Sequence, residues 1–195
     1  MAQSIAGLRT AVTGQMLSVV GPIIGCGMLV ALGAQVRIPV PWSDVPMTLQ
    51  ALAVLLTGFL LPPRSAVAAT VLYLLCGAAG LPVFIAGSTG LAGPTGGYLV
   101  GFVVAAWLVS VLKGTREPTF GRLLVAGFIG TFAILALGMA WRMILAGLWG
   151  SFGGDVGLAA MTGLMPFLPK AVVELFLAAT LVVSVHGMRY NHRRP

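Results

Sequence analysis

The sequence predicts an all-helical integral membrane protein, and two properties of the chain support this fold class. Hydrophobic residues make up 58% of the 195 residues and charged residues only 8%, against roughly 25% charged residues in soluble domains. The apolar residues occur in long runs, without the two-residue alternation of a membrane β-barrel. Because helices satisfy their backbone groups internally, they are the expected spanning elements. The length indicates one membrane domain, 1–195.

Six apolar runs predict six transmembrane helices, since a full span needs about 20 residues. We expect these helices at 15–34, 48–61, 64–79, 95–112, 119–142 and 167–187. The first run follows a stretch that is too polar for a cleavable signal peptide. The second is short for a full crossing and ends at Pro62 and Pro63, and the third starts directly after them. The fourth follows a loop rich in glycine and proline.

The basic residues predict that both termini lie in the cytoplasm, because Lys and Arg are enriched in cytoplasmic segments. With six spans, the segments on the side of the termini contain Arg9, Arg64, Lys113, Arg116, Arg122, Arg189, Arg193 and Arg194, and the opposite segments contain Arg37, Arg142 and Lys170. The net charge of +7 is therefore attributed to topology and to contact with anionic membrane lipid. Nucleic acid is not an expected partner.

The three outward segments, 35–47, 80–94 and 143–166, are rich in glycine or proline and are expected to be irregular. Irregular backbone at membrane depth is tolerated where it is buried in protein or lines a cavity. We therefore expect the loop 80–94 to fold inward as a cap or wall of an outward-facing pocket.

Glu174 lies inside the sixth span, where an ionisable group is costly and implies a polar partner or a functional cavity. Lys170 precedes it by four positions, so both side chains project from one helix face. An intrahelical ion pair is one interpretation. The other is ligand contact, because a lysine beside the free N–H groups of a helix start is well placed to hold a carboxylate. The sequence leaves both open.

Other polar and aromatic residues near the outward segments are further candidates for ligand contact. Arg142, at the outer end of the fifth span, is an alternative partner for a carboxylate. Thr48 and Gln50 open the second span after a proline-rich segment that fixes the backbone. Trp42, Phe84 and Tyr98 could supply flat apolar walls; each is also a plausible core or interface residue.

Catalytic and metal-binding motifs are not found in the sequence. It contains no phosphate-binding loop, zinc-protease motif or nucleophile elbow. Cys26 and Cys76 lie in apolar runs, without a histidine or second cysteine at metal-ligand spacing. We expect a binding protein without catalytic residues, cofactor or metal.

Small residues in the first span predict a contact with a partner helix. Gly21, Gly25, Gly27 and Ala31 form small-x-x-x-small pairs, which let helices approach closely in membranes.

Three motifs stand in order along the chain: VPMTLQ at 45–50, YLLCGAAGLPVF at 73–84 and GPTGGYLVGF at 93–102. They resemble the BioY family, the biotin-binding S components of energy-coupling factor (ECF) transporters. The resemblance covers nearly the whole chain and agrees with six spans and an outward pocket.

The resemblance implies a six-helix protein that captures biotin from outside a bacterial cell and takes it across the inner membrane. It also implies partners, namely a membrane coupling subunit contacted through the first helix and two cytoplasmic ATPases. In the binding site it implies backbone close to the ligand at Gly96 and Gly97. The remaining implied contacts are Gln50 and Thr48 with the ureido group, and Tyr98, Trp42 and Phe84 with the bicyclic ring.

The start of the sixth span departs from the family pattern Pro-Phe-hydrophobic-Pro-Gly-Asp-x-x-Lys, whose Asp and Lys contact biotin. Here Lys170 replaces the Gly, Ala171 the Asp and Glu174 the Lys. In the first interpretation, Lys170 binds the valerate carboxylate and Glu174 accepts from the ureido N–H groups. In the second, the ligand is another small carboxylate-bearing vitamin or precursor. The intact motifs favour biotin; an intramembrane enzyme is a third alternative.

Overall fold

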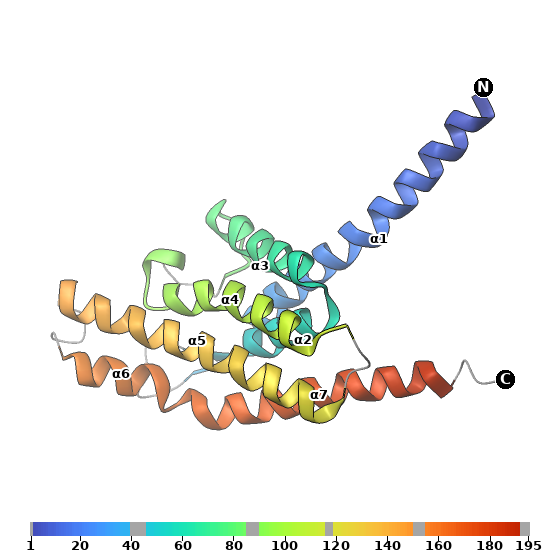
Figure 1. Cartoon of the computed structure of the whole chain (residues 1–195). Helices are drawn as coiled ribbons and strands as arrows, with labels where there is room; N and C mark the ends of the chain where they lie inside the picture. Colours follow the sequence, from blue (N-terminus) through green and yellow to red (C-terminus); the bar gives the residue numbers. More distant parts are fainter. Residues whose placement is uncertain (1, 40–45, 85–89, 116–118, 150–154, 192–195) are drawn as a thin grey trace.

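The structure is a computed structural model that describes residues 2–39, 46–84, 90–115, 119–149 and 155–191. These residues form a helical bundle with one small β-hairpin (Figure 1). The α-helices are α1 (Ala2–Gln35), α2 (Gln50–Leu60), α3 (Pro63–Ala78), α4 (Gly96–Lys113), α5 (Phe120–Trp149), α6 (Val156–Leu164) and α7 (Phe167–Asn191). A short 3-10 helix, η1 (Gly90–Ala92), precedes α4, and the strands β1 (Arg37–Ile38) and β2 (Met47–Thr48) lie between α1 and α2.

Four helical segments are long and apolar enough to cross a membrane: Met16–Gln35, Gly96–Lys113, Phe120–Leu148 and Val156–Gly187. Two further apolar helices, α2 and α3, are shorter. The 11 residues of α2 extend about 16 Å at about 1.5 Å per residue, half of a roughly 30 Å hydrocarbon core. The predicted apolar segments are thus helical, but α2 is not a complete span by itself.

Large hydrophobic side chains cover the outer surfaces of the long helices. Leu148 is 74% exposed, Leu17 67% and Phe132 66%. Exposure of this apolar area to water would be unfavourable, whereas contact with lipid would not. The surface therefore agrees with an integral membrane protein.

The central helix of the bundle is α4, which contacts α2, α3 and α5 and packs most extensively on α5. The backbones of α4 and α5 approach closely because glycines face the partner helix. A Cβ atom at Gly97 would collide with Trp141, and one at Gly101 would lie 2.9 Å from the Ile134 Cα. Helix α1 packs on α2 and α3, and α7 packs on α2 and α5. As a result, α2, α3, α4, α5 and α7 surround a common interior.

The β-hairpin holds the start of α2 against the end of α1. Strands β1 and β2 pair antiparallel, with Arg37 opposite Thr48. The Leu49 N–H then donates to the Gly33 carbonyl oxygen (3.1 Å). A Cβ atom at position 33 would lie 2.9 Å from the Leu49 carbonyl oxygen, so a glycine is needed for this approach. Within the outward segment 35–47, Arg37, Ile38 and Met47 are thus in regular strands. The pairing of these strands fixes the position of Thr48.

The expectation of an irregular segment at 143–166 is wrong for most of its length. Helix α5 continues to Trp149, and α6 occupies Val156–Leu164. Leucine, methionine and alanine recur in both stretches, and these residues favour helices. Asp155 caps α6 by accepting a hydrogen bond from the Leu158 N–H (2.9 Å).

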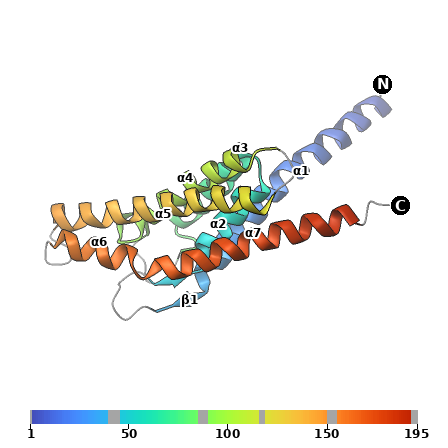
Figure 2. The same ribbon diagram turned by 60° about the horizontal axis from the view of Figure 1, so that its bottom comes forward.

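Both chain ends lie on the same side of the bundle in the two views of the molecule (Figures 1 and 2). The amino-terminal part of α1 extends there beyond the other helices. Lys113, the last residue of α4, donates to the carbonyl oxygens of Phe59 (2.5 Å) and Leu61 (2.9 Å) at the end of α2. Helices α2 and α4 therefore end at the same level.

Candidate ligand-binding pocket

A pocket lies between α2, α3, α4, α5 and α7. It is lined by the first turns of α2, α4 and α7, so it lies toward the end of the bundle that carries the hairpin. Its volume of about 70 Å³ exceeds the roughly 10–15 Å³ that a single water molecule needs. Phe84, from the described part of the glycine-rich loop 80–94, contributes to its wall, as does Thr95, the residue directly before α4. This agrees with the expectation that the loop folds inward.

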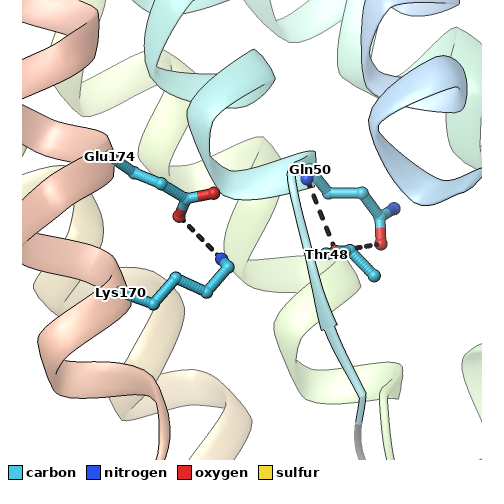
Figure 3. Close-up of polar contacts among 4 residues, drawn as sticks. All are labelled: Thr48, Gln50, Lys170 and Glu174. Carbon is cyan, nitrogen blue, oxygen red and sulfur yellow. Dashed lines mark hydrogen bonds and ion pairs between the residues drawn. The ribbon is translucent and has the colours of Figure 1, made fainter. Parts of the chain in front are cut away.

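Lys170 and Glu174 form an ion pair in the wall that α7 contributes (Figure 3). The Lys170 Nζ lies 2.7 Å from the Glu174 Oε2, and the two side chains are 18% and 5% exposed. The carboxyl group also lies near the backbone of Leu52 in the first turn of α2. Because the amino-terminal end of a helix carries partial positive charge, this position favours an anion.

Each partner of the pair keeps hydrogen-bonding capacity for a further group. An ammonium group has three donors, and one of them reaches Glu174. The Oε1 atom of Glu174 is buried and has no hydrogen-bond partner among the described residues. An unsatisfied buried polar atom typically costs about 1–3 kcal/mol. The pair can therefore offer donors and an acceptor to a ligand at the same time.

A chain of hydrogen bonds runs from the hairpin to α3 on another side of the pocket. The Thr48 hydroxyl donates to the Gln50 Oε1 (3.1 Å), and the Gln50 Nε2 donates to the Tyr73 hydroxyl oxygen (2.6 Å). The Thr48 oxygen also accepts from the Gln50 N–H (3.4 Å) (Figure 3). Gln50 is 4% exposed, so this network fixes its amide group. Because the Tyr73 hydroxyl accepts from Gln50, its own proton can serve another acceptor.

Aromatic rings form one part of the apolar wall of the pocket. Phe84 packs edge-on against Tyr73 with ring centroids 5.4 Å apart. Its ring occupies the space over Gly77, where any Cβ atom would collide with it. Tyr98 and Phe167 form a second pair at 5.8 Å. The Tyr98 hydroxyl donates to the Gly163 carbonyl oxygen, which fixes this ring against α6.

The structure brings most of the residues predicted for ligand contact into this one pocket. Its lining includes Thr48, Gln50, Phe84, Tyr98, Lys170 and Glu174. Trp42 lies outside the described residues. Gly96 and Gly97 do not line the pocket; a Cβ atom at Gly96 would collide with the Leu91 carbonyl oxygen, and one at Gly97 with Trp141. Their role is close packing of the chain against itself.

Arg142 does not line the pocket either. It is fully buried between α5 and α6. Its Nε donates to the Ala159 carbonyl oxygen (3.2 Å), and its Nη2 donates to the Thr162 hydroxyl (2.7 Å). The cation therefore holds α6 against α5, a role that the sequence could not suggest while 143–166 was expected to lack a helix.

The four small residues of the first span divide between two environments. A Cβ atom at Gly21 or Gly25 would meet nothing within 4 Å, so these positions are open. A Cβ atom at Gly27 would lie 3.1 Å from the Ala69 carbonyl oxygen of α3. Ala31 also packs against the core of this chain. Close packing within the molecule therefore explains Gly27 and Ala31, and only Gly21 and Gly25 remain free for a partner.

Sequence reasoning missed several side chains of the pocket, among them Tyr73, Thr131 and Phe167. Tyr73 and Phe167 lie within stretches that the family comparison used, but their apolar helices give no sign of which face is inward. Thr131 is an isolated polar residue in an apolar stretch of α5, so no neighbouring polar residue indicates a pocket contact. In the part of the chain that the structure describes, no three His, Cys, Asp or Glu side chains are grouped so that they could hold a metal ion.

Comparison with known proteins places these features in a family. Residues 9–190 match the sequence profile of the BioY family. The chain is 34% identical over 160 residues to the biotin transporter BioY of Thermotoga maritima, covering 80% of this chain and 89% of that protein. It is 34% identical over 172 residues to the biotin transporter BioY2 of Lactococcus lactis subsp. cremoris, covering 82% and 86%.

The fold is similar to that of a solved structure. The crystal structure at 2.1 Å of the S-component for biotin from an ECF-type ABC transporter aligns with a TM-score of 0.75 and 20% sequence identity. The alignment covers 89% of this chain and 93% of that chain.

Proposed function

Because this chain belongs to the BioY family, we propose that it captures biotin as the substrate-binding S component of an ECF-type transporter. The observation that carries the proposal is the pocket, into which all three motifs contribute side chains. They supply Thr48 and Gln50, Tyr73 and Phe84, and Tyr98. The transporter names of the relatives support transport in preference to catalysis.

Biotin has three parts that the pocket can recognise: a carboxylate, a ureido group and an apolar bicyclic ring. Lys170 would direct its remaining donors to the valerate carboxylate, since an ion pair with a ligand replaces part of the lost hydration. Glu174 would accept from a ureido N–H through its unsatisfied Oε1. Phe84 and Tyr98 would pack against the ring.

The Lys170–Glu174 pair would thus replace the Asp and Lys of the family pattern on the same helix. The pair carries one positive and one negative charge, as the Lys and Asp of the family pattern do. The net charge of this helix face is therefore the same as in the pattern. Gln50 and Thr48 would support the ureido end, because their hydrogen bonds already order that wall.

We place the protein in the cell membrane with six membrane-embedded helical segments and both termini in the cytoplasm. The four long spans and the two shorter apolar helices support this count. Both chain ends lie on one side of the bundle (Figures 1 and 2). The excess of basic residues in the same segments supports the orientation.

The partners would be an ECF coupling subunit in the membrane and two cytoplasmic ATPases, because the chain has no motif for binding ATP phosphates. The open part of α1, around Gly21 and Gly25, is the surface we assign to the coupling subunit.

The test is binding of biotin to the purified protein in detergent, measured by calorimetry or with radiolabelled ligand. We expect submicromolar affinity. No binding at about 100 µM, where even a weak ligand is detected, would overturn the assignment of biotin. A survey of other small carboxylate-bearing vitamins and precursors would then identify a ligand that suits the altered Lys170 and Glu174.

A further inference from the structure

Thr131 carries a second unsatisfied polar atom in the pocket wall. It lines the pocket from the middle of α5. Its hydroxyl oxygen is buried and has no hydrogen-bond partner among the described residues. A buried hydroxyl is normally hydrogen-bonded, so an unpartnered one at a ligand pocket is informative.

Three other helical threonines of this chain behave differently. Thr57, Thr70 and Thr162 each donate to the carbonyl oxygen four residues earlier, at 2.8, 3.0 and 2.8 Å. This local bond is the usual way in which a helix satisfies a threonine hydroxyl. The corresponding carbonyl for Thr131 belongs to Gly127, and the hydroxyl makes no bond to it. The hydroxyl is therefore left for a partner that the described chain does not supply.

The other hydroxyl groups of the pocket wall have acceptors or donors within the chain. The Thr48 hydroxyl donates to Gln50, the Thr95 hydroxyl to the Gly90 carbonyl oxygen (3.5 Å) and the Tyr98 hydroxyl to Gly163. The Tyr73 hydroxyl oxygen accepts from the Gln50 Nε2 (2.6 Å). The two lining atoms that are buried without a partner are the Thr131 Oγ1 and the Glu174 Oε1. One is a donor and the other an acceptor when the carboxyl group is ionised.

We propose that Thr131 is a specificity-determining residue whose hydroxyl donates to the ureido carbonyl oxygen of the ligand. This assignment rests on the proposed function, and it complements the role of Glu174 as acceptor for an N–H of the same cyclic urea. A ring that carries a C=O beside an N–H matches the two atoms in hydrogen-bonding character. A ligand with only carboxylate and hydrocarbon groups would leave Glu174 without a donor.

The test compares three variants with the wild type in biotin binding. Thr131→Val keeps the shape and removes the hydroxyl, and it should weaken binding by about 5- to 100-fold, the effect of leaving a buried ligand carbonyl unpaired. Thr131→Ser keeps the hydroxyl and should restore most of the affinity. Thr70→Val is the matched control, because its hydroxyl bonds within α3 and does not line the pocket; its affinity should equal that of the wild type.

Thermal unfolding without ligand gives a second readout. Thr131→Val should not lower the melting temperature, because it removes an atom that has no partner, whereas Thr70→Val should lower it. A fall for Thr131→Val as large as that for Thr70→Val would mean that the hydroxyl serves the fold, and would overturn the inference.

The outcomes separate this inference from the proposed function. If the wild type binds biotin and Thr131→Val binds it equally well, the role of Thr131 is refuted and the function stands. If the wild type does not bind biotin, the proposed function and the contact to a ureido group are refuted together.

Discussion

The Lys170 ammonium group and the Glu174 carboxylate, 2.7 Å apart on α7, lie between the pocket and an apolar groove on the outer surface. Both side chains line both spaces, together with Thr48. The groove side is otherwise formed by aliphatic residues of the hairpin and α7. Loss of the pair would therefore affect both the ligand contacts and the closure of the pocket toward lipid.

Removing one partner of the pair should destabilise the protein and weaken binding. Lys170→Met leaves the Glu174 carboxylate buried without its counter-ion, which costs about 3 kcal/mol in comparable cases. We also expect a 10- to 100-fold loss of biotin affinity, roughly the effect of losing one buried ligand contact. Chemical unfolding and calorimetry in detergent measure the two effects.

The double variant Lys170→Met/Glu174→Gln distinguishes a structural pair from a ligand-binding pair. With no charge left, the double variant should recover much of the stability that Lys170→Met loses, because no uncompensated charge remains buried. If the pair binds the ligand, affinity should stay low in the double variant. Affinity that recovers along with stability would instead support the interpretation as a purely structural ion pair.

Tyr73→Phe should destabilise the part of the pocket wall where Gln50 of α2 bonds to Tyr73 of α3. The change removes the oxygen that accepts from the Gln50 Nε2 at 2.6 Å, and it leaves that buried N–H unsatisfied. We expect a loss of about 1–3 kcal/mol in unfolding free energy and a lower affinity for biotin, because the Gln50 amide would no longer be fixed. Unchanged stability and affinity would show that Gln50 finds another acceptor.

The sequence was sufficient to predict the helical membrane fold and that Lys170 and Glu174 lie on one helix face, because residues four positions apart in a helix are neighbours. It was not sufficient to assign Gly96 and Gly97. Glycine indicates that something approaches the backbone closely, and here the neighbours are Leu91 and Trp141 of the same chain. Which group approaches the glycine depends on the tertiary structure, so the glycine itself does not identify that group.

Two other differences also arise from tertiary structure. Tyr73 lies in an apolar helix, where nothing in the sequence distinguishes a pocket residue from a core residue; its partner, Gln50, is 23 positions away. Arg142 was expected at the pocket because the segment after it was expected to be a loop. Helix α6 supplies carbonyl and hydroxyl acceptors for its guanidinium group, and Arg142 does not line the pocket.

Gly77→Ala should reduce biotin affinity by displacing a pocket ring. The new methyl group would collide with Phe84, which lines the pocket. We expect an affinity loss of about 10-fold, close to the roughly 1.4 kcal/mol of one aromatic contact. Gly121→Ala is the matched control: it also replaces a helical glycine, but its Cβ atom would meet nothing within 4 Å. Equal affinities in the two variants would show that Phe84 does not contact the ligand.

Arg142→Met should destabilise the protein without a direct effect on ligand binding. The fully buried guanidinium group bonds the Ala159 carbonyl and the Thr162 hydroxyl, and hydrogen bonds to charged groups contribute about 1.5–3 kcal/mol each. We expect a lower melting temperature and faster proteolysis around α6, with biotin affinity close to that of the wild type well below the melting temperature. The opposite pattern, a tenfold or greater loss of affinity with an unchanged melting temperature, would assign the cation to the ligand. Lys170→Met provides the comparison, because that change should lower both quantities.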